Sequence, residues 1–226
     1  MASMSVSRAC LGLLLLAAGG VRAASAPTGA SARCDAGLLP DPVPSRSRGR
    51  TLHVSVSGRG LGTEADPMSL REALKRASPG DKVVLGSGIY HLGASSAPVR
   101  LGPPGSGPED LTVFEAAPCA RVILTSDDEL PPAIVVSDYV RLERLWIGGK
   151  RLPCHRPKGL GDPGDCSRNA IVLGAVPRGV GRELVNNTIF GYFGGIVQGS
   201  SEKSLYQGNR FVRVGGGSWG HPIYIS

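Results

Sequence analysis

The sequence contains few aromatic residues, only 5% of its 226 positions. Low aromatic content suits a narrow core filled by Ile, Val and Leu, and 41% of hydrophobic residues is ample for a folded domain. Convincing helical patterns are scarce as well, whereas turn formers are abundant, with 33 Gly and 18 Pro. These proportions indicate one ordered domain with many turns and little helix.

The N-terminal apolar run, residues 10–21, is too short to cross a bilayer, which needs about 20 apolar residues. It follows Arg8 and precedes the small residues 23–26, which is the order of a secretory signal peptide. We therefore predict a signal peptide over residues 1–23 and a secreted or periplasmic protein. A retained membrane anchor is the less favoured alternative.

Cysteine is scarce too, and removal of the signal peptide leaves four: Cys34, Cys119, Cys154 and Cys166. An even number in an exported chain indicates disulfides. Cys154 and Cys166 bracket one Pro- and Gly-rich segment and form the natural pair, which leaves Cys34 with Cys119. Because no C-x-x-C spacing occurs, a zinc site is disfavoured.

Acidic residues are in the minority. Without Arg8 and Arg22 the mature chain has 23 basic and 18 acidic residues, a net charge of +5. This excess favours acidic partners such as uronate-containing glycans, although it also serves solubility. No nucleic-acid-binding motif or basic helix is present, so we predict no nucleic-acid partner.

A repeat is present near the end of the chain. Apolar runs begin at Ile171, Ile196 and Ile223, at intervals of 25 and 27 residues, which are typical of stacked supersecondary repeats. A second series, residues 187–190 and 209–212, follows in step. Because strand side chains alternate between two faces, the three isoleucines can form one inner file of a coil of parallel strands. The repeat therefore predicts an all-β fold, a parallel β-helix.

The residues before the repeat divide into a linker and further strands. Residues 24–50 are rich in Ala, Ser, Pro and Arg without an apolar period, which predicts a flexible linker. The β-helix domain then covers residues 51–226. We expect it to be incomplete at its C-terminus, because the last run ends at Ser226 without a cap. Alternating runs predict strands over residues 51–56, 81–85, 88–92, 111–114, 121–125, 133–136 and 140–147.

One helix is predicted after the first strand. Asp66 is placed to cap it, and Pro67 takes the first helical position. Pro79 and Gly80 end it. An apolar stripe should cover the first turn of the coil and consists of Leu70, Ala73, Leu74 and Ala77.

Residues 69–74, 78–85 and 88–90 resemble the N-terminal cap and first turn of right-handed parallel β-helix proteins of the pectate lyase-like superfamily, which includes alginate and chondroitin lyases. Asn187 and Asn209 resemble its asparagine ladder, in which stacked amides satisfy the turn backbone. The resemblance implies a right-handed β-helix with an N-terminal capping helix. It also implies β-elimination of an acidic glycan, if the protein is active.

Uronate lyases of this superfamily use a base to remove a proton and a positive charge to stabilise the enolate-like state. Residues 221–224, His-Pro-Ile-Tyr, look like the His-Gly-Ile-Tyr run of some alginate-acting members, with Pro222 in place of Gly. We expect His221 or Tyr224 to be the base and Arg213 or Lys203 to neutralise the carboxylate; a turn histidine and a surface tyrosine are the alternative. The predicted substrate-binding residues are Arg210 and, in the long loop after residue 148, His155, Arg156 and Lys158.

Other features of the sequence leave a second function open. The outward positions Val135, Val172 and Val197 are apolar and offer a sugar little to bind. The alternative is therefore a non-catalytic carbohydrate-binding or cell-surface repeat protein with the same coil. We expect a monomer without a cofactor. Asp162 and Asp165 could bind calcium with loop carbonyls, but two carboxylates are too few to define a site.

Overall fold

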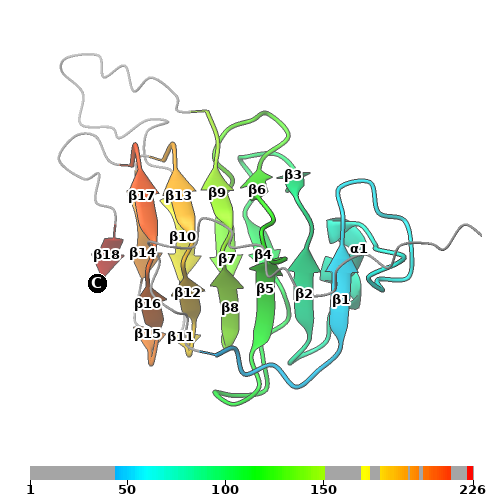
Figure 1. Ribbon diagram of the computed structural model, residues 1–226. Helices are drawn as coiled ribbons and strands as arrows, with labels where there is room; N and C mark the ends of the chain where they lie inside the picture. Colours follow the sequence, from blue (N-terminus) through cyan, green and yellow to red (C-terminus); the bar gives the residue numbers. More distant parts are fainter. Residues whose placement is uncertain are drawn as a thin grey trace, which may run out of the picture. The chain divides into compact units, whose positions relative to one another are not determined.

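The computed structural model describes residues 44–150, 169–173, 179–192, 194–198, 201–214 and 223–225 (Figure 1). For residues 169–173, 194–198, 201 and 223–225 it describes the backbone only. The predicted signal peptide lies outside the described residues.

The described strands form three main sheets (Figure 1). Sheet A contains, in order, β1 (Thr51–Val54), β2 (Lys82–Leu85), β5 (Thr112–Ala116), β8 (Val140–Glu143), β12 (Glu183–Val185) and β16 (Leu205–Gln207). Sheet B contains β3 (Gly88–His91), β6 (Val122–Thr125), β9 (Trp146–Gly148), β13 (Thr188–Phe190) and β17 (Arg210–Val212). Sheet C contains β4 (Val99–Leu101), β7 (Ile134–Val136), β10 (Asn169–Leu173), β14 (Gly194–Gln198) and β18 (Ile223–Ile225). β11 (Gly179–Val180) pairs with β15 (Ser201–Glu202).

The chain visits sheets A, B and C in turn, and each strand pairs in parallel with the strand one turn later. This is the predicted parallel β-helix. It is right-handed, as is the rule for crossover connections between parallel strands. The predicted file of isoleucines is confirmed, because Ile134, Ile171, Ile196 and Ile223 are register partners on successive strands of sheet C.

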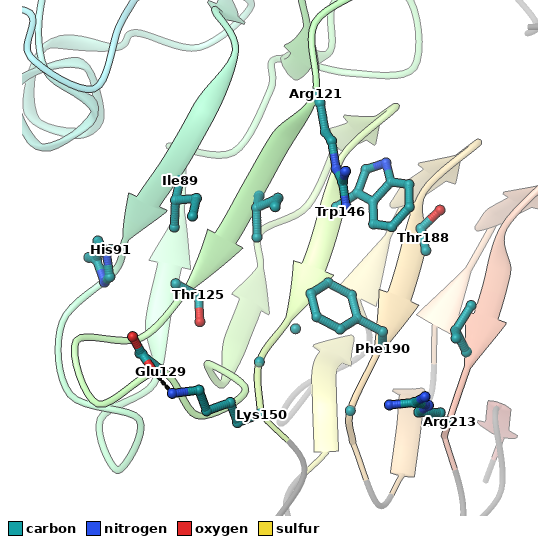
Figure 2. Close-up of a pocket in the computed structure, with 15 residues that line it drawn as sticks. Ile89, His91, Arg121, Thr125, Glu129, Trp146, Lys150, Thr188, Phe190 and Arg213 are labelled. Carbon is teal, nitrogen blue, oxygen red and sulfur yellow. Dashed lines mark ion pairs between the residues drawn. The ribbon is translucent and has the colours of Figure 1, made fainter. Parts of the chain in front are cut away.

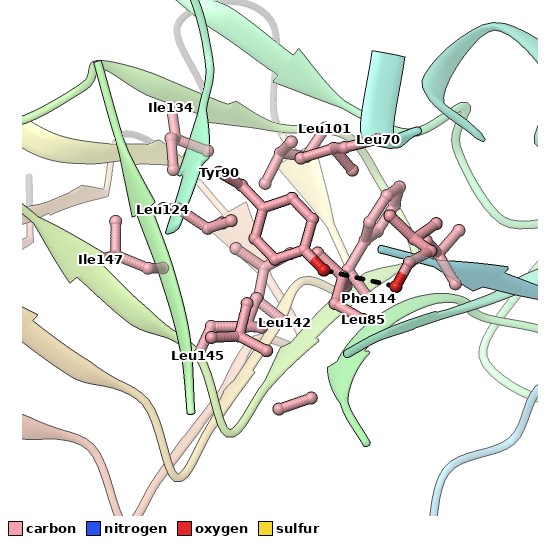
Figure 3. Close-up of a cluster of buried hydrophobic side chains, with 14 of the residues drawn as sticks. Leu70, Leu85, Tyr90, Leu101, Phe114, Leu124, Ile134, Leu142, Leu145 and Ile147 are labelled. Carbon is pink, nitrogen blue, oxygen red and sulfur yellow. Dashed lines mark hydrogen bonds between the residues drawn. The ribbon is translucent and has the colours of Figure 1, made fainter. Parts of the chain in front are cut away.

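Aliphatic side chains fill the interior of the coil. In sheet A, Val83, Phe114, Leu142 and Leu184 are register partners, and all four are buried. The Tyr90 hydroxyl lies within hydrogen-bond distance of two backbone carbonyls, that of Gly86 at 2.8 Å and that of Val54 at 3.3 Å, and Figure 3 draws the bond to Val54. Burial raises the pKa of Tyr90 to about 12. Tyr90 therefore serves as a core residue whose polar end is satisfied by the backbone.

The helix α1 (Leu70–Arg76) lies against β1 at the first turn of the coil (Figure 1). Its predicted stripe is confirmed: Leu70 and Ala73 are buried, and Leu74 and Ala77 pack against the core.

The predicted start of the helix is wrong. Ser69 caps it, because its hydroxyl accepts the amide of Glu72 at 3.2 Å. The Asp66 carboxylate instead accepts the amide of Leu61 at 2.9 Å and closes the preceding loop. Met68 forms a β-bridge with Val54, which holds the chain after Pro67 in an extended conformation until Ser69.

Replacing Ser69 with Ala is expected to cost about 1 kcal/mol of the free energy of unfolding, because the Glu72 amide loses its acceptor. Urea unfolding measures the loss, and hydrogen exchange at the Glu72 amide locates it. Asp66→Ala is the control, since it leaves this amide protected. Faster exchange at Glu72 in Asp66→Ala but not in Ser69→Ala would mean that the capping residue is misassigned.

The last part of the predicted linker forms hydrogen bonds with the coil. The amide of Arg50 donates to the Asp81 carboxylate at 2.8 Å, and the amide of Gly49 donates to the carbonyl of Gly80 at 2.9 Å. One turn further along the coil, the carbonyl of Arg46 accepts the amide of Leu111 at 2.8 Å. Residues 44–50, called the N-terminal segment below, thus cross successive turns at the start of the sheet A strands (Figure 1).

The predicted strand over residues 140–147 is two strands, β8 and β9. They belong to different sheets and are separated by Arg144, whose φ of 57° is in the left-handed region. Asn186 and Gly208 have the same conformation after the partner strands β12 and β16. On these three turns, a left-handed residue therefore directs the chain from sheet A to sheet B.

The predicted asparagine ladder follows these residues and is confirmed. The Asn187 Oδ1 accepts the amide of Leu145 at 3.0 Å, and its Nδ2 donates to the carbonyl of Leu142 at 2.9 Å. The Asn209 Oδ1 accepts the Asn187 amide at 3.0 Å. Each side chain thus satisfies backbone groups of the turn before it, which is a structural role.

Candidate functional site

A groove of about 800 Å³ runs along the outer face of sheet B (Figure 2). Strands β3, β6, β9, β13 and β17 all contribute to it. The side chains that alternate with its lining, Tyr90, Leu124, Ile147 and Ile189, are buried in the coil. The pleat of the strands therefore separates a core face from a groove face.

The floor of the groove is apolar. Ile123, Trp146 and Thr188 are register partners on three adjacent strands, and Phe190 is the partner of Gly148. A Cβ at Gly148 would collide with the carbonyl oxygen and ring of Phe190. The absence of a side chain at Gly148 therefore lets the Phe190 ring lie against β9.

Trp146 holds a basic side chain at one margin of the floor (Figure 2). The Arg121 guanidinium lies over the indole, with its central carbon 4.5 Å from the ring centroid. The rings of Trp146 and Phe190 meet edge to face, with centroids 6.3 Å apart and an interplanar angle of 66°. Stacking on an aromatic ring leaves the guanidinium free to bind an anion in its plane.

The opposite margin carries Lys150 and Arg213. Lys150 forms an exposed ion pair with Glu129, which lowers the pKa of the Glu129 carboxyl by hydrogen bonding and by its charge. Glu129 is the one acidic residue among the described residues that line the groove. Within the described part of the chain, neither Arg121 nor Arg213 forms an ion pair with a carboxylate. The groove therefore has a positive balance of charge.

His91 lies at the β3 end of the groove (Figure 2). Its Nδ1 is 3.0 Å from the carbonyl oxygen of Ser126, so in the neutral ring Nδ1 carries the hydrogen and Nε2 is left as an acceptor. An imidazole in this tautomer can take up a proton at Nε2.

The structure divides the predicted site residues into four groups. Arg213 lines the groove, and Arg210 is exposed on β17, where its register partner is Thr188. Lys203 is exposed in the turn before β16 and is not part of the groove lining. For Tyr224 the structure gives only the backbone, paired with Val197. The other four, His221, His155, Arg156 and Lys158, lie outside the described residues.

Cys119 is disulfide-bonded. The other cysteines of the two predicted pairs, Cys34, Cys154 and Cys166, lie outside the described residues, so both pairings stay predictions. The described residues contain no group of three or more His, Cys, Asp or Glu suited to hold a metal ion. Asp162 and Asp165 are outside that part of the chain. No helix in the described ranges has the length and hydropathy needed to span a bilayer.

Sequence reasoning missed the floor of the groove and its Arg121 margin. Trp146 and Phe190 lie on the strands that follow the ladder position, and their outward direction was readable from the buried Ile147 and Ile189 beside them. The outward positions singled out from the sequence, Val135, Val172 and Val197, are all on sheet C. The side chains of the latter two are not described.

No protein-family model matches the sequence, and no curated protein matches it. A search of solved structures finds similarity to the crystal structure of pectate lyase Pel9A, with 16% sequence identity and a TM-score of 0.46. The match covers 73% of this chain and 47% of that chain. This chain thus spans about half the length of that enzyme.

Proposed function

We propose that the protein binds an acidic, uronate-containing polysaccharide in the groove of sheet B. The observation that carries this proposal is the arrangement of Arg121, Lys150 and Arg213 around an aromatic floor, with Glu129 as the one carboxylate among the described lining residues. The basic balance of the whole chain acts in the same direction, because it raises the local concentration of polyanions.

The chemistry of a uronate chain fits both parts of the groove. A pyranose ring has an apolar face of C–H groups, which packs on aromatic rings such as Trp146 and Phe190. Its carboxylate is planar and accepts two parallel hydrogen bonds from a guanidinium, as Arg121 or Arg213 could supply. A neutral glycan would use the floor but leave the Arg121 and Arg213 guanidinium groups without a carboxylate partner.

We further propose that the bound glycan is cleaved by β-elimination. His221 and Tyr224 remain proposed bases, and Arg213 remains the proposed partner of the carboxylate. His91 is an additional candidate, because its Nε2 is left as an acceptor and its side chain lines the same groove as Lys150, whose charge could stabilise the enolate-like state. The competing proposal is binding without cleavage.

Replacing Arg213 with Ala is expected to weaken binding of an oligouronate by about 10- to 100-fold, because a hydrogen bond to a charged group contributes about 1.5–3 kcal/mol. Calorimetric titration of the purified protein measures the dissociation constant. Arg71→Ala, an exposed arginine of α1, is the matched control and should bind as the wild type does.

The same samples separate binding from cleavage. Incubation with alginate, pectate or chondroitin should give unsaturated products that absorb in the ultraviolet. Binding without such products supports the non-catalytic alternative. If no acidic glycan binds, the proposed function is wrong.

A further inference from the structure

We infer that the glycan carries a carboxylate on every second sugar and lies along the axis on which the turns stack. This inference rests on the proposed function and goes beyond it, because it selects alternating copolymers of uronate and a neutral sugar over chains made of uronate alone. It follows from the order in which charged and uncharged residues line the groove from β6 to β17.

The cations are concentrated at β9 and β17. Lys150 follows β9, and the Arg121 guanidinium lies over Trp146 of the same strand. Arg213 follows β17, and Arg210 is exposed on that strand. The two positively charged positions are thus separated by one strand, β13 (Figure 2).

The strand between them provides no charge to the groove. β13 and the residue after it contribute Thr188, Phe190 and Gly191. Gly191 has a φ of 78°, and a Cβ there would collide with the carbonyl oxygen of Gly149. The backbone therefore excludes any longer side chain, basic ones included, at the position of β13 that corresponds to Arg213.

The other neighbour of β9 is also unsuited to a carboxylate. From β6 the groove receives Ile123 and Thr125, and the loop after β6 brings Glu129. A uronate over this strand would bring its carboxylate toward Glu129, which already holds the nearby Lys150 in an ion pair. Repulsion between like charges selects against such a ligand.

The distance between strands of the coil sets the distance between the two positively charged positions. Adjacent strands are about 4.8 Å apart, so β9 and β17 are separated by about 10 Å. One sugar of an extended chain is nearly as long as one strand spacing. A chain that follows the stacking axis therefore places successive sugars over successive strands, with cations at every second sugar.

Two hexasaccharides of equal length test the inference by calorimetric titration of the full chain. One alternates uronate with N-acetylhexosamine and carries no sulfate, and the other contains uronate only. We expect the alternating compound to bind at least about 10-fold more tightly, although it has half the charge. Tighter binding of the all-uronate compound would overturn the inference but leave the proposed function standing. If neither compound binds, the proposed function itself has failed.

Thr188→Lys provides a second, independent test, because it adds a cation over β13. This variant should bind the all-uronate hexasaccharide about 10-fold more tightly than the wild type does, and its preference between the two compounds should shift toward the all-uronate one. Arg71→Ala is again the control, and thermal unfolding shows whether each variant is folded. Unchanged affinity for the all-uronate compound in a folded Thr188→Lys protein would show that no sugar lies over β13, and the inference would be wrong.

Discussion

Replacing Arg141 with Met is expected to lower the free energy of unfolding by about 3–5 kcal/mol. Arg141 is on the outer face of β8, yet none of its side chain is exposed. Its Nε donates to Glu143 at 2.8 Å, and its Nη1 donates to Glu183 at 3.1 Å. Both carboxylates are themselves buried, so removal of the guanidinium leaves two negative charges with less compensation.

Urea unfolding with a constant m-value checks this prediction. Lys82→Met is the matched control, because the Lys82 ion pair with Glu115 is 3.3 Å long and 28% of the lysine side chain is exposed. Partly exposed pairs of this kind contribute about 1 kcal/mol or less. If Arg141→Met is no more destabilised than the control, Arg46 and Arg144 compensate the charges of Glu183 and Glu143 unaided.

Replacing Asn187 with Leu is expected to cost about 3 kcal/mol or more. Leucine has a similar volume, so the loss comes from hydrogen bonding and not from a cavity. The amide of Leu145 and the carbonyl of Leu142 each lose a partner in a buried place, at about 1–3 kcal/mol for each group left unsatisfied. The Oδ1 of Asn209 loses one of its two donors and keeps the Asn187 amide.

Asn209→Leu is the comparison, because Asn209 is half-buried and water can replace part of its bonding. A loss of about 1 kcal/mol is expected there. Hydrogen exchange at the Leu145 amide should become faster in Asn187→Leu and stay slow in Asn209→Leu. Equal losses in the two variants would mean that burial of the ladder does not set its energetic contribution.

The coil could be predicted from the sequence because its core is periodic along the chain. Ile171, Ile196 and Ile223 repeat at nearly the same interval, and stacking one turn on the next is the simplest way to bury them. The start of the helix was harder to predict than the coil. Asp66 and Ser69 both suit an N-cap, and the choice is made by the bridge between Met68 and Val54, a contact from outside the helix.

The groove could be predicted only in part. Arg213 could be predicted as a site residue, because a basic residue near the end of a strand can be recognised from the local sequence alone. Arg121 was not, because its position over Trp146 depends on the register between β6 and β9, which the sequence does not reveal. Ile89 and Ile123 also resemble core residues in an alternating pattern, although both face the groove. An outward apolar floor is therefore hard to distinguish from an inward one before the strands are paired.

The ion pair between Arg46 and Glu183 joins positions 137 residues apart in the chain. A ribosome releases Arg46 early and Glu183 much later, so this contact cannot form while the first turns are being synthesised. The coil can grow from its N-terminal end by local stacking, and the N-terminal segment can bond Gly80, Asp81 and Leu111 early. Its ion pair with Glu183, however, must wait for β12, the fifth strand of sheet A. The order of translation thus makes the ion pair between Arg46 and Glu183 a late event in biosynthesis, after the turns that residues 44–50 cross have been laid down.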